Sequence, residues 1–280
     1  MMLRLLLFFA PLFAAYQSAG QAFSALSYNI RYDNPGDGEN AWPLRREFLA
    51  AQIRFHQPDI LGIQEGLHRQ VEYLQEALPD YTYVGVGRDD GAQSGEYTAL
   101  FFQTTRFEAV KNGTFWLSPT PERVSKGWDA ALPRICTWAW LRDRRSNDTL
   151  LVLNTHFDHL GAQARLESAR LLLRFIQTNN PGNWPVILLG DFNCTPNEAP
   201  YAELTRELSD ARASSRQPHF GPRGTFNGFD FHKPVELQID FIFTSKNIRS
   251  LQHATLSDHQ DCRYPSDHLP VLAKLDLSDR

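Results

Sequence analysis

The 280-residue sequence has few cysteines, no excess of basic residues and no long apolar run. Its three cysteines, Cys136, Cys194 and Cys262, allow at most one internal disulfide, and their spacing fits no Cys/His metal site. Lysine and arginine number 28 against 32 acidic residues, so the net charge is −4 and no basic stripe indicates a dedicated nucleic-acid binder. A bound divalent cation can still supply positive charge locally. No stretch has linker composition, which predicts a single folded domain.

The N-terminal region combines one early positive charge with a short apolar block. Arg4 precedes an uncharged block over residues 5–15, and small residues follow it. The block contains Pro11 and is shorter than the roughly 20 residues of a membrane span, so a cleaved signal peptide over residues 1–22 is favoured over an anchor helix. We therefore expect a secreted or periplasmic protein without a stable membrane anchor, with its domain over residues 23–280.

One stretch near the middle of the chain ends an apolar run on polar side chains. Val186 to Leu189 are four consecutive apolar residues, and Gly-Asp-Phe-Asn follows them directly. Such a run is typical of a strand buried on both faces, and open α/β sheets place their chemistry just past the ends of such strands. The pattern predicts a strand that presents Asp191 and Asn193; a simple turn is the alternative reading.

The sequence contains two strand, helix, strand units of similar length. The first spans a strand at 23–30, a helix at 43–56 and a strand at 59–65, and the second spans 150–154, about 166–176 and 186–191. Asn29 and Glu65 are 36 positions apart, and His156 and Asp191 are 35 apart. This predicts a pseudo-symmetric molecule with both units directed at one site. Further strands are expected at 97–102, 113–117, 135–141, 224–231, 238–244, 252–257 and 270–277, and further helices near 67–78 and 201–208.

Polar residues that interrupt or end apolar runs form the candidate site. Four carboxylates gathered at strand ends would repel one another unless a cation lay between them. Mg²⁺ or Mn²⁺ suits carboxylate, amide and water ligands better than Zn²⁺ does, which leaves the histidines free for proton transfer or anion binding. The residues are Asn29, Glu65, His156, Asp191, Asn193, Asp240, Asp267 and His268.

Six short motifs in one order carry a resemblance to a known family. The sequence resembles the endonuclease/exonuclease/phosphatase superfamily of metal-dependent phosphoesterases, which includes DNase I, bacterial sphingomyelinases and the deadenylases. The resemblance implies an α/β fold, a four-layer α/β sandwich of two packed, mostly antiparallel β-sheets flanked by helices, and a Mg²⁺-dependent phosphoric ester hydrolase. The motifs are SYNIR at Ser27, QE at Gln64, NTHFDH at Asn154, GDFN at Gly190, IDFIF at Ile239 and SDH at Ser266.

The resemblance also implies that three of these residues bind the metal and that two others act on the attacking water and the phosphate. Asn29, Glu65 and Asp267 would form the metal site, with Glu65 as the main ligand. Asp191 would orient or deprotonate the attacking water, and Asn193 would hold the phosphate and the nucleophile.

The remaining roles concern the phosphate. His268 resembles the histidine that contacts phosphate oxygens, and Asp240 would hydrogen-bond it and favour its protonated form. His156 would be a second donor to the phosphate, and Arg134 is a candidate phosphate ligand. The implied reaction is an in-line attack of water on phosphorus with no phosphoenzyme.

Two other functions compete with this interpretation. Asn154, His156, Asp158 and His159 nearly match the HxHxDH motif of zinc hydrolases related to metallo-β-lactamases, but asparagine stands where the first histidine should be. Asp158 and His159 also fit a simpler role as caps of the following helix. The second competitor is a catalytically inactive binding protein on the same fold.

The substrate is the least determined feature of the sequence. The Trp-Cys-Asp-Arg stretch typical of inositol 5-phosphatases is absent, and residues 226–229 read Phe-Asn-Gly-Phe instead. Without a basic surface, a phosphodiester or phosphomonoester in a small-molecule or lipid-linked substrate is favoured, and a secreted DNase I-like endonuclease is the alternative. Long loops at 88–96 and 118–133 are candidate binding loops. We expect a monomer.

Overall fold

The computed structural model describes residues 22–277, so all but the last residue of the expected signal peptide lies outside the described residues. No helix within this range has the length and apolarity needed to cross a membrane. The elements are β1 (Phe23–Asn29), the 3₁₀ helix η1 (Pro35–Asn40), α1 (Trp42–His56), β2 (Ile60–Gln64), α2 (His68–Ala77), β3 (Tyr81–Val84), β4 (Leu100–Gln103), β5 (Phe107–Trp116), β6 (Ile135–Asp143), β7 (Thr149–His156), α3 (Ala162–Asn179), β8 (Val186–Asp191), α4 (Ala199–Leu204), β9 (Ser209–Asp210), β10 (Asp240–Thr244), β11 (Ile248–Thr255) and β12 (Val271–Leu277).

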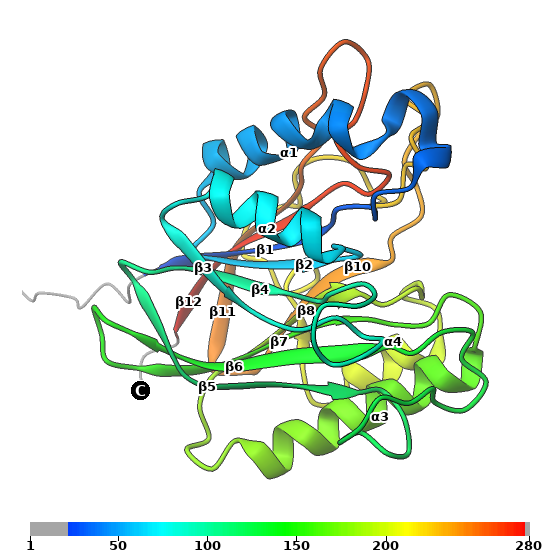
Figure 1. Cartoon of the computed structure of the whole chain (residues 1–280). Coiled ribbons are helices and arrows are strands. Elements are labelled where there is room, and N and C mark those ends of the chain that lie inside the picture. Colours follow the sequence, from blue (N-terminus) through cyan, green and yellow to red (C-terminus); the bar gives the residue numbers. More distant parts are fainter. Residues whose placement is uncertain (1–21, 278–280) are drawn as a thin grey trace, which may run out of the picture.

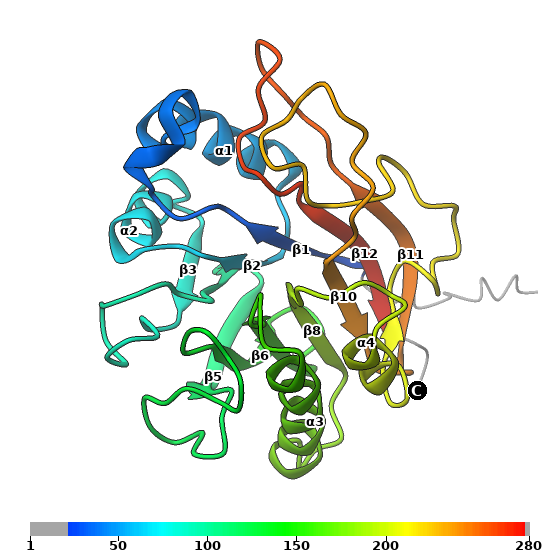
Figure 2. The same cartoon turned by 90° about the vertical axis from the view of Figure 1, so that its right-hand side faces the viewer.

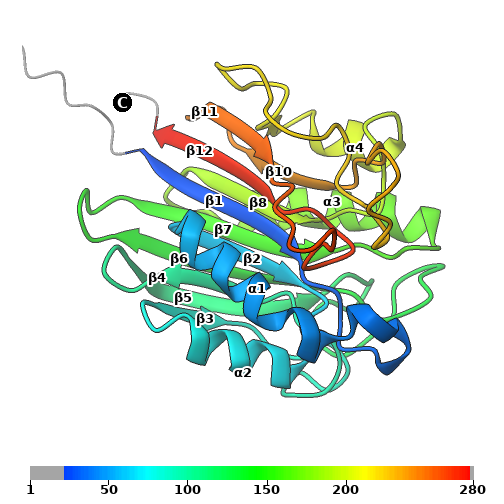
Figure 3. The ribbon, with the colours of Figure 1, turned by 90° about the horizontal axis from the view of Figure 1, so that it is seen from above.

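Two six-stranded sheets stack face to face between two layers of helices (Figure 1). Their strand orders are β11-β12-β1-β2-β4-β3 and β5-β6-β7-β8-β10-β9. The helices α1 and α2 cover the first sheet, where Figure 3 shows them from above, and α3 and α4 cover the second. Each sheet has one parallel pair, β1 with β2 or β7 with β8, and its other neighbours pair antiparallel. The four-layer α/β sandwich that the sequence implied is confirmed.

Alternate residues of the central strands pack into two different apolar layers. Along β1, Phe23 and Ala25 face the layer between the two sheets, whereas Leu26 and Tyr28 face α1 and α2. A third apolar layer fills the space between the second sheet, α3 and α4. Because both faces of these strands are buried, they read as continuous apolar runs and not as alternating ones.

The two strand, helix, strand units occupy equivalent places in the two sheets. The parallel pairs β1/β2 and β7/β8 lie at the centre of each sheet, and the helix of each unit packs on its outer face. The strands β10 and β12 run antiparallel to these pairs, so their first residues lie at the edge where β8 and β1 end. Figure 2 looks onto this edge, where loops surround the ends of β1 and β8. Polar residues from both halves of the chain therefore meet there.

Several expected elements differ from those observed. Residues 224–231 are not a strand: Phe226 makes isolated bridges only, and Gly228, with a φ of 59°, turns the chain immediately afterwards. The short helix η1 and the strands β3 and β9 are additional to the expected elements. The strand β5 starts at Phe107, six residues before the expected position. No described cysteine forms a disulfide.

Candidate active site

A cleft of about 530 Å³ opens at the edge where the central strands end. Of the predicted site residues, Asn29 and Asp240 lie buried behind it, and the other seven line it. The lining residues are Arg31, Tyr32, Glu65, Glu96, Leu132, Arg134, His156, His159, Asp191, Asn193, Phe226, Leu237, Ile239, Asp267 and His268.

The amide of Asn29 lies between two carboxylates from different sheets. Its Nδ2 donates to Glu65 Oε1 and to Asp191 Oδ2, each at 3.0 Å. Glu65 follows β2 in a left-handed conformation with a φ of 64°, and its Oε2 accepts from the backbone N–H of Tyr32. A left-handed backbone is strained for a residue with a branched or long side chain, and strained residues cluster at functional sites. The conformation of Glu65 is therefore consistent with a role in the cleft.

The acidic groups around Asn29 carry more negative charge than the protein neutralises. Burial, followed by the nearby charge of Asp240, raises the pKa of Asp191 to about 7. Burial and the charge of Glu65 likewise raise the pKa of Asp267, although the ring of His268 opposes this. Oxygens of Glu65 and Asp191 and a nitrogen of His156 lie within 4.8 Å of one another. This set of mainly oxygen ligands, with its excess of negative charge, fits a hard divalent cation.

His268 and Asp240 form a buried hydrogen-bonded pair. Nδ1 of His268 lies 2.8 Å from Asp240 Oδ2, which also accepts from the hydroxyl of Thr225 at 2.6 Å. Burial disfavours the charged ring, but the charge and hydrogen bond of Asp240, together with the charges of Asp191 and Asp267, outweigh it and hold the pKa of His268 well above its ordinary range. The other ring nitrogen, Nε2, lies 3.8 Å from Asp191 Oδ2. The pair therefore presents a protonated imidazole to the cleft.

His156 also lies beside Asp191 but differs from His268 in charge. Its Nε2 is 3.1 Å from Asn193 Nδ2 and 3.5 Å from Asp191 Oδ2. Burial and then the guanidinium of Arg134 lower its pKa well below the ordinary value, so this imidazole is neutral. The Nδ2 of Asn193 also donates to the carbonyl of Phe157, and its backbone N–H donates to Asp191 Oδ1.

Arg134 brings a buried cation to the same cleft. Its side chain is 6% exposed, and Nε and Nη1 have no hydrogen-bond partner among the described residues. The nearest carboxylates are Asp158, at 3.5 Å from Nε, and Glu96, at 3.9 Å from Nη1. Buried donors without partners are rare, and a guanidinium can donate two parallel N–H bonds to the oxygens of a phosphate, so Arg134 suits a phosphate in the cleft.

The residues of the near-match to the zinc motif do not converge. Asn154 is fully buried between the sheets, where Nδ2 donates to the carbonyls of Ile63 and Ala99. Asp158 accepts from the backbone N–H groups of residues 160 and 161 just before α3, and it pairs with Arg134. This geometry contradicts the zinc-hydrolase interpretation and favours the capping role of Asp158.

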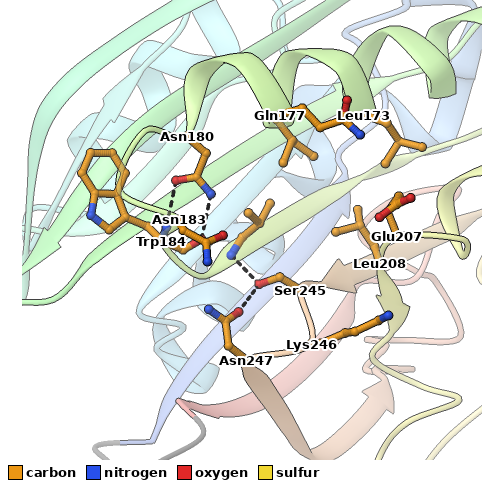
Figure 4. A pocket seen from close by; sticks show the side chains of 12 residues that line it. Leu173, Gln177, Asn180, Asn183, Trp184, Glu207, Leu208, Ser245, Lys246 and Asn247 are labelled. Atoms are coloured by element: carbon orange, nitrogen blue, oxygen red, sulfur yellow. Dashed lines mark hydrogen bonds between the residues drawn. The ribbon is translucent and has the colours of Figure 1, made fainter. Parts of the chain in front are cut away.

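A second hollow, of about 370 Å³, lies at the other end of β8 (Figure 4). Asn180 hydrogen-bonds the backbone of Trp184 there, and Ser245 hydrogen-bonds Asn247. Its lining holds one acid, Glu207, and no histidine. It lacks the clustered acids of the cleft.

Sequence reasoning left several residues of the cleft out of the predicted site. Glu96 accepts from Arg88 Nη1 at 2.6 Å and lies 4.0 Å from His156 Nδ1. Glu96 ends the loop at 88–96, which the sequence predicts only as a candidate binding loop. Thr225, which anchors Asp240, and Phe226 come from the segment expected to be a strand. No local pattern distinguishes these residues from ordinary loop residues.

Comparison with known proteins agrees with this geometry. A model of the endonuclease/exonuclease/phosphatase family matches residues 26–268. The chain belongs to this family. Among solved structures, a family member from Bacteroides thetaiotaomicron is 37% identical with a TM-score of 0.90, and the match covers 93% of this chain and 99% of that one. A mannosyl-6-phosphatase from the same organism is 38% identical with a TM-score of 0.87, and the match covers 90% and 99%.

Family members with curated names are more distant. The exoribonuclease subunit Ccr4 of the CCR4-Not complex from Mycosarcoma maydis is 20% identical over 95% of this chain. This chain spans about half of the length of that relative, 52%. These named members of the endonuclease/exonuclease/phosphatase family, the phosphatase and the exoribonuclease, are hydrolases of phosphate esters.

A divalent cation is expected to stabilise this family member more at pH 8 than at pH 5. Because the pKa of Asp267 is raised, protons compete with the metal for this ligand at low pH, and below the pKa of the neighbouring Asp191, about 7, a negative charge that attracts the cation is lost as well. At a metal concentration 100 times Kd the gain in the free energy of unfolding is about 2.7 kcal/mol. Melting temperatures with MgCl₂ or MnCl₂ against EDTA at both pH values measure it. Glu65→Gln should show a smaller shift at pH 8; equal shifts at both pH values would contradict the ligand assignment.

Proposed function

We propose that the protein is a metal-dependent phosphoesterase whose preferred substrate is a phosphomonoester of a small hydroxylated molecule, first of all a sugar phosphate. The observation that carries this proposal is the convergence in one cleft of the acidic cluster around Asn29, the protonated His268 and the guanidinium of Arg134, whose Nε and Nη1 have no hydrogen-bond partner among the described residues. An acidic cluster can hold a cation, and the two cationic side chains can hold the ester phosphate beside it. The 38% identity to a mannosyl-6-phosphatase favours a sugar phosphate.

Three residues would hold the metal: Glu65, Asp267 and the amide of Asn29. When bound, a divalent cation there supplies charge stabilisation to the phosphoryl oxygens and lowers the pKa of a coordinated water. We propose Mg²⁺, with Mn²⁺ as the alternative, because the oxygen-rich donor set suits both.

The protein side chains orient the reactants and move the proton. Asp191 accepts the proton of the attacking water, and Asn193, fixed by its bond to the carbonyl of Phe157, orients the water and one phosphoryl oxygen. His268, kept protonated by Asp240, donates to a nonbridging oxygen and stabilises its negative charge in the transition state. As the P–O bond breaks, the leaving oxygen takes a proton from solvent and departs as the alcohol, and Asp191 returns its proton to solvent.

The other wall of the cleft holds the ester. Arg134 donates its unpaired N–H groups to the phosphate, and the neutral His156 donates one further hydrogen bond to it. Water attacks phosphorus opposite the leaving oxygen, so no phosphoenzyme forms.

A nuclease is the second candidate function, because curated relatives include exoribonucleases. The net charge of −4 argues against it, since binding to a polyanion depends on an excess of basic contacts.

We further propose that the chain is exported after cleavage of residues 1–22 and acts as a monomer without a stable membrane anchor. The N-terminal sequence and the mass in solution of the exported protein test these points.

The test of the function is a hydrolysis panel with the full-length domain in Mg²⁺ or Mn²⁺. Its substrates are mannose 6-phosphate, p-nitrophenyl phosphate, bis-p-nitrophenyl phosphate, sphingomyelin, plasmid DNA and polyadenylate RNA. We expect release of inorganic phosphate from the monoesters, and its loss in His268→Ala. A higher kcat/KM on DNA or RNA would establish the nuclease instead. Silence on every substrate with both metals would favour the inactive binding protein.

A further inference from the structure

Exposed apolar side chains gather at the mouth of the cleft. Of the nine large apolar residues that are exposed within residues 22–277, three line it: Phe226 at 38% exposure, Leu237 at 45% and Leu132 at 38%. Single exposed apolar residues are normal, whereas a group of them beside a polar site marks a binding surface. These three residues are called the apolar rim below.

Phe226 is the member of the rim closest to the proposed phosphate site. Its ring meets the ring of His268 edge to face, with centroids 5.0 Å apart and planes at 67°. Its backbone N–H donates to the carbonyl of Leu237 at 3.1 Å, so the two side chains belong to neighbouring segments. The ring of Phe226 therefore lies within reach of the ester substituent of a phosphate that accepts a hydrogen bond from His268.

The turn that carries Phe226 is held in place by hydrogen bonds. The backbone N–H groups of Asn227 and Gly228 both donate to the carbonyl of Asp267, and Asn227 Nδ2 donates to the carbonyl of Ser266. Gly228 has a φ of 59°, a conformation that a residue with a Cβ adopts only with strain. The ring is therefore presented by a fixed loop that is tied to the segment of His268.

Polar side chains line the same cleft. They include Glu96, whose side chain is 17% exposed, and the guanidinium of Arg134, two residues after Leu132. A cleft that offers both apolar and hydrogen-bonding side chains is complementary to a ring that has an apolar face and polar edges. A pyranose ring has both, because its C–H groups lie on its faces and its hydroxyls point outward.

We infer that the apolar rim of Phe226, Leu237 and Leu132 is the subsite for the leaving group and binds one face of the pyranose ring of a sugar phosphate. This inference rests on the proposed function, since it describes what the phosphate in the same cleft is attached to. Phe226 is a specificity-determining residue: it stacks on the ring and takes no part in the proton transfers. A phosphate ester without a ring gains nothing from it.

The test compares Phe226→Ala with wild type on mannose 6-phosphate and on glycerol 3-phosphate, which has hydroxyls but no ring. We expect KM for mannose 6-phosphate to rise about 10-fold, equivalent to roughly 1.4 kcal/mol, while KM for glycerol 3-phosphate changes by a clearly smaller factor. Phe226→Trp should restore the KM for mannose 6-phosphate. Phe220→Ala, which removes a ring that is 75% exposed outside the cleft, is the matched control and should behave as wild type.

The outcomes separate the subsite from a structural role and from the function itself. An equal loss on both substrates would mean that Phe226 only supports His268, and this overturns the inference, as would an unchanged KM for mannose 6-phosphate. A larger loss on adenosine 5′-phosphate than on mannose 6-phosphate would assign the rim to a nucleobase and overturn the sugar. Wild-type protein that hydrolyses no phosphate ester with either metal would overturn the proposed function and the inference with it.

Discussion

His268→Ala is expected to lower kcat for the preferred phosphate ester by roughly 10²- to 10⁴-fold, the usual range for a lost proton-transfer or charge-stabilising group. His268 is the cationic imidazole of the cleft, because Asp240 at 2.8 Å holds its pKa well above the ordinary range. Alanine leaves no donor for the phosphoryl oxygen. Steady-state kinetics measure the loss, and circular dichroism verifies that the variant is folded. Activity within a few-fold of wild type would exclude the assigned role.

The partner Asp240 provides a control that keeps the imidazole in place. In Asp240→Asn the ring loses its neighbouring carboxylate, so the pKa of His268 falls and the ring loses its proton at a lower pH. The alkaline limb of the pH–kcat profile should therefore move to lower pH, whereas the profile of His268→Ala should lack this limb. His268→Gln keeps a donor towards Asp240 and separates the lost charge from the lost packing.

The architecture was largely predictable because the central strands carry strong local signals. The run from Val186 to Leu189 is buried on both faces, and polar residues follow such runs only where they serve a purpose or begin a turn. The same argument applies to β1, which ends at Asn29. The two units are far apart in the sequence, but their parallel pairs occupy the centres of the two stacked sheets, so their strand ends can meet at one edge.

The loops of the cleft were not predictable because tertiary contacts decide their conformation. The stretch with Phe226 reads as a strand, but Gly228 and the hydrogen bonds to the carbonyl of Asp267 turn it away from the sheet. Glu96 reaches the site because its loop is closed by contacts such as its bond with Arg88. A local sequence pattern identifies neither the carbonyl of Asp267 nor the side chain of Arg88 as a contact partner.

Asn154 shows the opposite error, in which a sequence pattern indicated chemistry that the fold does not support. Its position two residues before His156 resembles a metal-binding motif, and the two side chains share one face of β7. Asn154, however, lies deeper between the sheets, where it joins them by accepting from Gln64 and donating to the carbonyls of Ile63 and Ala99. Only His156, at the last position of the strand, reaches the cleft.

Asp191→Asn is expected to separate activity from stability. The change preserves the shape of the side chain but removes the acceptor for the water proton, so kcat should fall by roughly 10²- to 10⁴-fold. Asp191→Ala should lose a similar factor, because both variants lack the carboxylate. Turnover near the wild-type value in either variant would exclude Asp191 as the base.

The stability of the metal-free Asp191→Asn protein should also depend less on pH than that of wild type. Because burial raises the pKa of Asp191 to about 7, the folded state prefers the neutral carboxyl, and this group makes the protein less stable as the pH rises from about 4, its ordinary pKa, to 7. Asparagine cannot ionise, so this part of the loss disappears. Urea unfolding in EDTA at pH 5 and pH 8 measures the difference, with the exposed Asp80→Asn as control. An unaltered pH dependence in Asp191→Asn would show that the buried carboxyl is not the group that destabilises the metal-free fold, and that the cation is not needed there to offset its charge.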